Sequence, residues 1–160
     1  MSSLPATSPD TPQVHVLQAG QLRVSRDLCE VMEVLVMSAG VAVVATDESA
    51  AAMGLLYVTT AAASRPGELS LRRGLPRLLS QMRRAGTALQ EDTCRFLLIG
   101  CSGHRDFFAW SRVGQENLLA AKAMLQAQGI DRITVDSGEA FCRKVCLELW
   151  SQQVTVQCPD

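Results

Sequence analysis

The sequence lacks the features that mark membrane-spanning and nucleic-acid-binding proteins. No apolar run reaches the roughly 18 uncharged residues that a membrane-spanning helix needs. Fifteen Lys and Arg stand against 16 Asp and Glu, which gives a formal net charge of −1. A balance of this kind offers no electrostatic reason to expect nucleic acid or an anionic membrane surface. We therefore expect no nucleic-acid partner and no membrane insertion.

The start of the sequence also lacks the marks of a secretory signal. Residues 1–12 are rich in Ser, Thr and Pro, and they contain neither a basic segment nor an apolar one. We predict a flexible lead-in over residues 1–12 and a cytoplasmic location. The whole sequence is 48% apolar. Residues 13–160 are long enough to form one globular domain with a substantial core.

The six cysteines lack the spacing of a metal site. No CxxC pair is present, the only close pair is Cys142 and Cys146, and the chain has just two histidines, His15 and His104. A zinc cluster is poorly supported by this set. We predict reduced cysteines that pack as small apolar residues, no metal and no cofactor.

Hydrophobic patterning predicts strands interleaved with two helices, which is typical of an α/β domain with mixed sheets. One apolar stretch, residues 31–46, is broken at residues 38–40 and therefore predicts two strands. Residues 145–150 and 154–157 predict a closing hairpin. One further strand is predicted to begin at Val14, and three others cover residues 53–60, 94–100 and 130–136.

Both predicted helices end at a glycine. The first has an apolar face from Leu71 to Met82 and ends at Gly86. Pro76 lies inside this pattern, so the helix either starts near residues 74–76 or kinks there. Its arginines predict a solvated face, with a binding patch as the alternative. The second helix is predicted between Gly114 and Gly129.

Several short motifs occur in an order that resembles the CheD family of chemoreceptor glutamine deamidases. The resemblance covers residues 14–157. Its motifs are SAGVAV (38–43), MGLLYV (53–58), LIGCS (98–102), VGQEN (113–117), QGI (128–130) and DSGEAFCRK (136–144). This resemblance implies a layered sandwich of mixed β-sheets flanked by helices.

The same resemblance places the three catalytic positions of the family on residues that cannot perform its chemistry. The family's nucleophilic cysteine falls on Gly40, its histidine on Tyr57, and its active-site threonine on Val34. A deamidase needs a thiolate to attack the carboxamide and an imidazole to move protons. Glycine has no side chain, valine has no hydroxyl, and a phenol is a poor base near neutral pH. We therefore predict a pseudoenzyme.

The family motifs that this chain keeps predict structural roles. Asn117, Asp136, Gly138 and Arg143 stand at the family spacing. Gly138 suits a turn with positive φ, and Asp136 can accept hydrogen bonds from nearby backbone N–H groups. Arg143 can brace a loop through paired hydrogen bonds.

Two alternatives stay open for the degenerate site. Gly40 and Tyr57 could form a partner-binding groove, which requires Tyr57 to be partly exposed beside an apolar strip. They could instead fill an unused cleft, which requires a buried Tyr57 with a satisfied hydroxyl. A separate alternative is a deamidase that uses a relocated pair, Cys101 and His104, three residues apart after a strand.

The leading hypothesis is a catalytically inactive CheD-like domain that binds proteins in chemotaxis signalling. The resemblance implies three kinds of partner, namely a chemoreceptor helix, a CheC-like phosphatase or an active CheD. The second hypothesis is the deamidase with the relocated pair, and the third is a structural or oligomerisation protein unrelated to chemotaxis.

Overall fold

The structure is a computed structural model that describes residues 9–37, 39–59, 69–89, 92–100, 108–137 and 142–158. These residues form two sheets and two helices. The first sheet contains, in spatial order, β1 (Gln13–Leu17), β3 (Glu30–Met37), β8 (Cys142–Glu148) and β9 (Gln153–Gln157). The second contains β2 (Gln21–Ser25), β5 (Ala52–Val58), β4 (Val41–Asp47), β6 (Cys94–Gly100) and β7 (Ile133–Asp136). The helices are α1 (Leu71–Arg84) and α2 (Phe108–Ala127).

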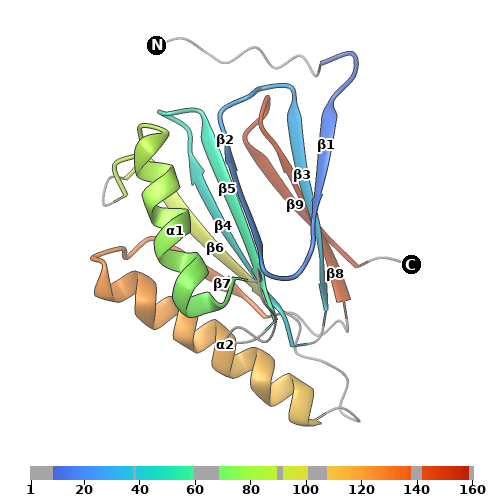
Figure 1. Cartoon of the computed structure of the whole chain (residues 1–160), viewed down its shortest axis with the longest axis vertical. Helices are drawn as coiled ribbons and strands as arrows, with labels where there is room; N and C mark the ends of the chain where they lie inside the picture. Colours follow the sequence, from blue (N-terminus) through green and yellow to red (C-terminus); the bar gives the residue numbers. More distant parts are fainter. Residues whose placement is uncertain are drawn as a thin grey trace.

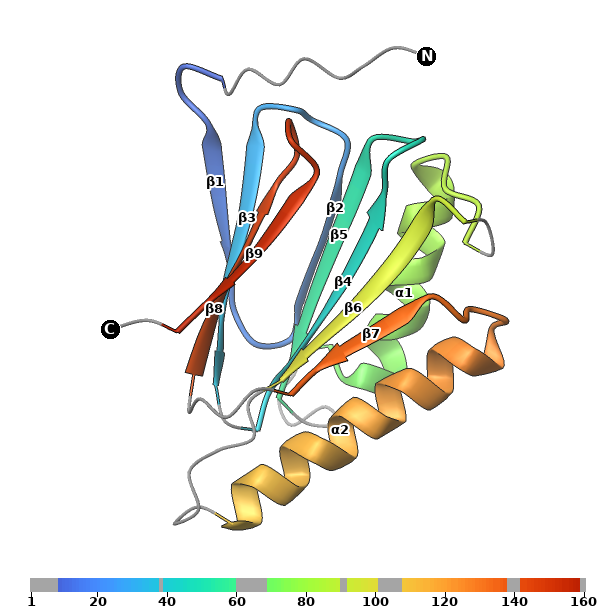
Figure 2. The same cartoon turned by 180° about the vertical axis from the view of Figure 1, so that it is seen from behind.

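These elements form three layers. Both helices cover one face of the five-stranded sheet, and the four-stranded sheet packs on its other face (Figure 1). Figure 2 shows the same order of layers from behind. Each sheet contains both parallel and antiparallel pairs, because β1 runs parallel to β3 and β7 runs parallel to β6. The predicted layered α/β sandwich of mixed sheets with flanking helices is confirmed.

Strands β4 and β5 are buried on both faces, which explains their almost continuous apolar sequence. In β4, Val41 and Val43 pack toward the helices, and Ala42 and Val44 pack toward the other sheet. The predicted break at residues 38–40 lies between β3 and β4. It carries the chain from the four-stranded sheet to the five-stranded sheet.

Helix α1 begins earlier than a start at Pro76 would allow. The side chain of Ser70 caps it by accepting a hydrogen bond from the Arg73 N–H at 3.2 Å. The helix continues through Pro76 and ends before Gly86, whose φ of +95° is one that glycine adopts without strain. Its apolar face packs on β5 so closely that a Cβ added at Gly54 would lie 2.7 Å from Leu78 Cδ1.

The sequence prediction differs most from the structure at two places, while the strands predicted over 130–136 and 145–150 are β7 and β8 with bounds shifted by two or three residues. Helix α2 begins at Phe108 rather than Gly114, because Gly114 lies inside the helix on its buried side and does not break it. Strand β2 was not predicted, since its five residues QLRVS are short and only partly buried. Neither described helix is long and apolar enough to span a bilayer.

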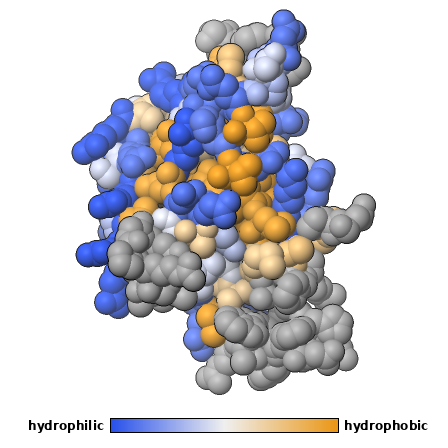
Figure 3. Space-filling model, turned by 45° about the vertical axis from the view of Figure 1, so that its right-hand side comes forward, coloured by the Kyte–Doolittle hydropathy of each residue, from blue (hydrophilic) through white to orange (hydrophobic). Residues whose placement is uncertain are grey.

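The four-stranded sheet presents its outer face uncovered by any described helix. Apolar side chains on this face are exposed at Val14, Val16, Leu35 and Met37. Figure 3 views this side of the molecule obliquely and shows hydrophobic residues gathered across its middle. The predicted hairpin of β8 and β9 closes the sheet, and Gln152 in its turn has a φ of +56°.

Candidate functional site

The structure brings together the three positions that the sequence predicted as a degenerate catalytic site. Val34 lies on β3, Gly40 follows the turn after β3, and Tyr57 lies near the end of β5. Val34 and Tyr57 belong to the same apolar core between the two sheets, where Val34 is 1% exposed. None of the three residues carries a thiol or an imidazole.

Gly40 and Tyr57 are in direct contact. A Cβ added at Gly40 would lie 2.5 Å from Tyr57 Cε2, 2.7 Å from its hydroxyl oxygen and 2.9 Å from Cζ. These distances are too short for any side chain at position 40 unless the tyrosine ring moves. The ring therefore occupies the space into which a residue-40 side chain would project.

The Tyr57 side chain is buried and its hydroxyl has a partner. The residue is 5% exposed, and its hydroxyl oxygen accepts a hydrogen bond from the Met37 N–H at 3.0 Å. The partly exposed Tyr57 that a groove at Gly40 and Tyr57 requires is absent from the structure. The geometry is that of the second alternative, in which the pair fills the cleft.

Asn117 ties helix α2 to the same end of the molecule. Its side-chain amide, 4% exposed, donates hydrogen bonds to the carbonyl oxygens of Ala39 at 3.1 Å and Thr59 at 3.5 Å. Ala39 belongs to the turn before β4, and Thr59 directly follows β5. The buried amide thus stabilises the backbone beside Gly40 and Tyr57.

Asp136 and Arg143 form a clamp between the two sheets. Arg143 Nη1 and Nη2 donate to Asp136 Oδ1 at 2.6 Å and Oδ2 at 2.8 Å. Nη1 also lies 3.5 Å from the Gly100 carbonyl oxygen at the end of β6. Arg143 thus makes paired hydrogen bonds to a carboxylate, the geometry on which its predicted bracing role depends. Among the described residues, Asp136 accepts from this guanidinium and not from the backbone N–H groups that the sequence predicted. Hydrogen bonding by Arg143, opposed by burial and helped by its charge, lowers the pKa of Asp136.

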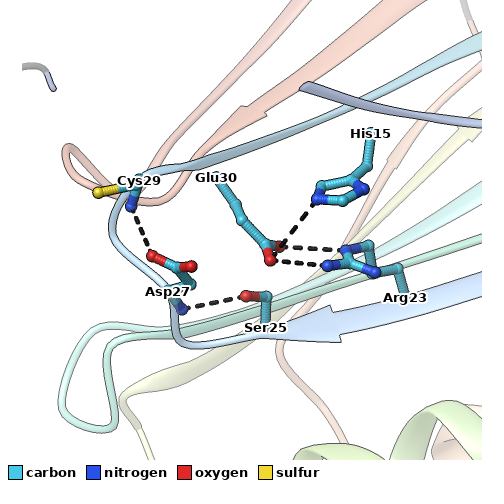
Figure 4. A network of polar contacts seen from close by, with 6 residues as sticks. All are labelled: His15, Arg23, Ser25, Asp27, Cys29 and Glu30. Carbon is cyan, nitrogen blue, oxygen red and sulfur yellow. Dashed lines mark hydrogen bonds and ion pairs between the residues drawn. The ribbon is translucent and has the colours of Figure 1, made fainter. Parts of the chain in front are cut away.

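A second clamp, which no sequence pattern predicted, joins the sheets at their β1 and β2 edges. Glu30, 6% exposed, accepts hydrogen bonds from Arg23 Nη2 at 2.6 Å and Nε at 3.1 Å (Figure 4). His15 Nε2 lies 3.6 Å from Glu30 Oε1, an ion pair when the imidazole is protonated. Burial raises the pKa of Glu30, but hydrogen bonds from Arg23 and Ser25 outweigh it and lower the pKa overall.

The cysteines differ in exposure, and of the five that the structure describes only Cys94 packs in the apolar core, so the prediction that all do so was wrong. Cys29 and Cys158 are exposed, Cys142 and Cys146 are half-buried, and Cys94 is buried. Burial, with the charge of Asp47, raises the pKa of the Cys94 thiol to about 12, so this thiol is unreactive at neutral pH. Within the described ranges, no three His, Cys, Asp or Glu residues gather to hold a metal ion.

Residues 1–8 of the predicted lead-in lie outside the described residues, and so do three residues with predicted roles. They are Cys101 and His104, the relocated catalytic pair, and Gly138, the predicted turn glycine.

Comparison with protein families identifies the chain by its second half. A family model described as "CheD chemotactic sensory transduction" matches residues 71–158, more than half of the chain. This protein belongs to the CheD family. The match contains Asn117, Asp136 and Arg143. It begins after Val34, Gly40 and Tyr57, which therefore lie outside it. Among curated proteins, no sequence matches.

Two solved structures are similar at low identity. A Neisseria meningitidis protein of the DUF152 family aligns at 13% identity with a TM-score of 0.45, over 74% of this chain and 53% of that one. The Bacillus licheniformis hypothetical protein YfiH aligns at 10% identity with a TM-score of 0.45, over 82% and 62%. The present chain spans less than two thirds of either protein.

Proposed function

We propose that this CheD-family protein serves chemotactic signalling by binding a protein partner, without deamidase chemistry. The observation that carries the proposal is the contact between Gly40 and Tyr57. At the position assigned to the family's thiol there is no side chain, and a buried tyrosine ring fills the space where one would project.

A deamidation step at this position would lack both of its participants. The nucleophile must carry an electron pair to the carboxamide carbon, and a base must accept its proton. The Tyr57 hydroxyl is engaged by the Met37 N–H, and the ring lies in the core between the sheets. A glutamine side chain would have to displace that ring to enter.

The residues that hold the surrounding frame are nevertheless kept. Asn117 fixes the turn before β4, and Asp136 with Arg143 links the two sheets. Because these structural residues are kept while the catalytic residues are not, they support a role in which the folded domain binds a partner through its surface. Membership of the CheD family favours a chemoreceptor helix as the partner, ahead of a CheC-like phosphatase or an active CheD.

The test is an incubation of the purified protein with the helical cytoplasmic fragment of a chemoreceptor from the same host. We expect a complex by size-exclusion chromatography and no glutamine-to-glutamate mass change, while an active CheD protein as control produces that change. A mass change that disappears in Cys101→Ala would overturn the proposal and favour the relocated Cys101 and His104 pair. Absence of any complex with receptor, CheC-like protein and active CheD would also overturn it.

A further inference from the structure

Helix α1 carries a concentration of positive charge that the rest of the chain does not share. The whole sequence has a net charge of −1, yet this helix contains no acidic residue. Five exposed arginines lie on it: Arg72, Arg73, Arg77, Arg83 and Arg84.

The placement of the N-terminal arginines does not stabilise the helix. Arg72 and Arg73 lie in the first turn, where the helix dipole disfavours positive charge. Arg73 and Arg77 are four residues apart, a spacing at which like charges repel. Arg83 and Arg84 lie in the last turn, where the dipole favours positive charge, so only the N-terminal arginines stand at a cost in helix stability.

The same arginines have no carboxylate partner in the described part of the chain. Arg23, Arg132 and Arg143 each pair with a carboxylate. By contrast, no guanidinium of α1 forms an ion pair or hydrogen bond to another described residue. The helix therefore offers free positive charge to an incoming molecule.

An apolar groove of about 210 Å³ lies beside this charge, between α1 and the end of α2. Leu75, Pro76, Leu79, Met124 and Ala127 line it, and Arg83 is its one charged residue. Arg72 is eleven residues before Arg83, close to three helical turns, so both lie on the flank of α1 that faces the groove. Arg84 is turned about 100° from Arg83.

We propose that the groove between α1 and α2 binds an acidic amphipathic helix of a protein partner. Its apolar face enters the groove, and its carboxylates pair with Arg83 and Arg72. Charge complementarity selects this occupant, because the groove has an apolar floor and a positive rim with no acidic residue in its lining. The inference rests on the proposed function, since it assigns a surface to the signalling partner.

The probe is a labelled synthetic helical peptide with leucines on one face and glutamates on the other, measured by fluorescence anisotropy. We expect Arg83→Glu to weaken binding by about tenfold or more, because it places a like charge at the contact. Arg84→Glu is the matched control, with the same charge change at a neighbouring exposed position, and we expect about threefold or less. Equal losses in the two variants would overturn the proposal, because they would indicate unspecific attraction to a basic surface.

A second pair of variants tests the groove itself. Ala127→Trp fills it, and Gln126→Trp adds the same bulk on α2 at an exposed position outside the lining. We expect only Ala127→Trp to abolish peptide binding, with both proteins folded by circular dichroism. Binding that survives Ala127→Trp would overturn the proposal. So would binding to phosphatidylglycerol vesicles or single-stranded RNA with no binding of the peptide.

The chemoreceptor fragment separates this proposal from the proposed function. If it binds wild type and is lost with Ala127→Trp, both are supported. If it binds the two proteins equally, the groove inference is overturned and the proposed function stands. If the peptide binds as expected and the receptor fragment, a CheC-like protein and an active CheD do not, the groove stands and the proposed function is overturned.

Discussion

Two contacts at the same end of the sandwich differ in what they depend on. Gly40 and Tyr57 contact each other by packing, because the Tyr57 ring fills the space that a side chain at position 40 would occupy. Asp136 and Arg143 meet by charge and paired hydrogen bonds. The first pair departs from the CheD motif and the second keeps it. The comparison teaches that this end of the fold is held by two independent kinds of contact, one of packing between Gly40 and Tyr57 and one of charge between Asp136 and Arg143.

The largest effect is expected from Tyr57→Ala. Removing a buried aromatic ring leaves a cavity between the sheets, which typically lowers the free energy of unfolding by about 4 kcal/mol. Urea denaturation followed by circular dichroism measures it. A loss below about 1 kcal/mol would show that the ring is not part of the core, because such small losses are typical of exposed sites.

Gly40→Ala sharpens the shape argument. We expect it to lower the free energy of unfolding by about 2 kcal/mol, since its Cβ would overlap the Tyr57 ring and overpacking costs that much. In the Tyr57→Ala background the same change should cost nearly nothing. Additive effects in this double-mutant cycle would contradict the direct contact.

Asp136→Asn addresses the charged pair. We expect a loss of about 1–2 kcal/mol in the free energy of unfolding at pH 7, because a charge-assisted hydrogen bond is replaced by a neutral one. The pKa of Asp136 is lowered in the folded state. Its stabilisation is therefore complete above the unfolded-state pKa, near 4, and is lost as the pH falls through the lower folded-state pKa.

The measurement is the difference between wild type and Asp136→Asn in urea denaturation from pH 7 to pH 2.5. We expect this difference to shrink below about pH 4. Glu30, whose pKa is also lowered, is present in both proteins and cancels. A difference that stays constant with pH would show that the carboxylate charge contributes nothing.

The smallest effect is expected from Tyr57→Phe. The ring and its contact with Gly40 remain, and the Met37 N–H loses the hydroxyl oxygen as acceptor. A loss of about 1 kcal/mol in the free energy of unfolding is expected. A much larger loss would mean that hydrogen bonding, rather than ring volume, dominates the role of Tyr57.

Most elements of the fold were predictable because their signals are local. The apolar pattern of α1 and the glycine after it define that helix, and the break at residues 38–40 separates β3 from β4. Strand β2 was missed because it pairs only with β5 and has no strong apolar pattern. The early start of α2 was missed because Gly114 was interpreted as a boundary, although its lack of a side chain suits the buried side.

The candidate site was predictable in composition and not in geometry. The resemblance to the CheD motifs placed the family's catalytic positions on Val34, Gly40 and Tyr57, which carry neither a thiol nor an imidazole. Whether Tyr57 faces solvent or the core depends on strand register, in which it pairs with Ala42 of β4. No sequence pattern predicts the ion pair of Glu30 and Arg23. The two residues come into contact only because β2 and β3 belong to different sheets that pack together.

The sequence by itself determined the layered α/β class, the family motifs in the second half and the absence of thiol and imidazole at positions 40 and 57. These follow from residue identity and from patterns with a period of a few residues. Only the tertiary structure decided that the Tyr57 ring is buried against Gly40, that Asp136 pairs with Arg143, and that an apolar groove lies beside the exposed arginines of α1. Each of these depends on contacts between segments far apart in the chain, which no local pattern encodes.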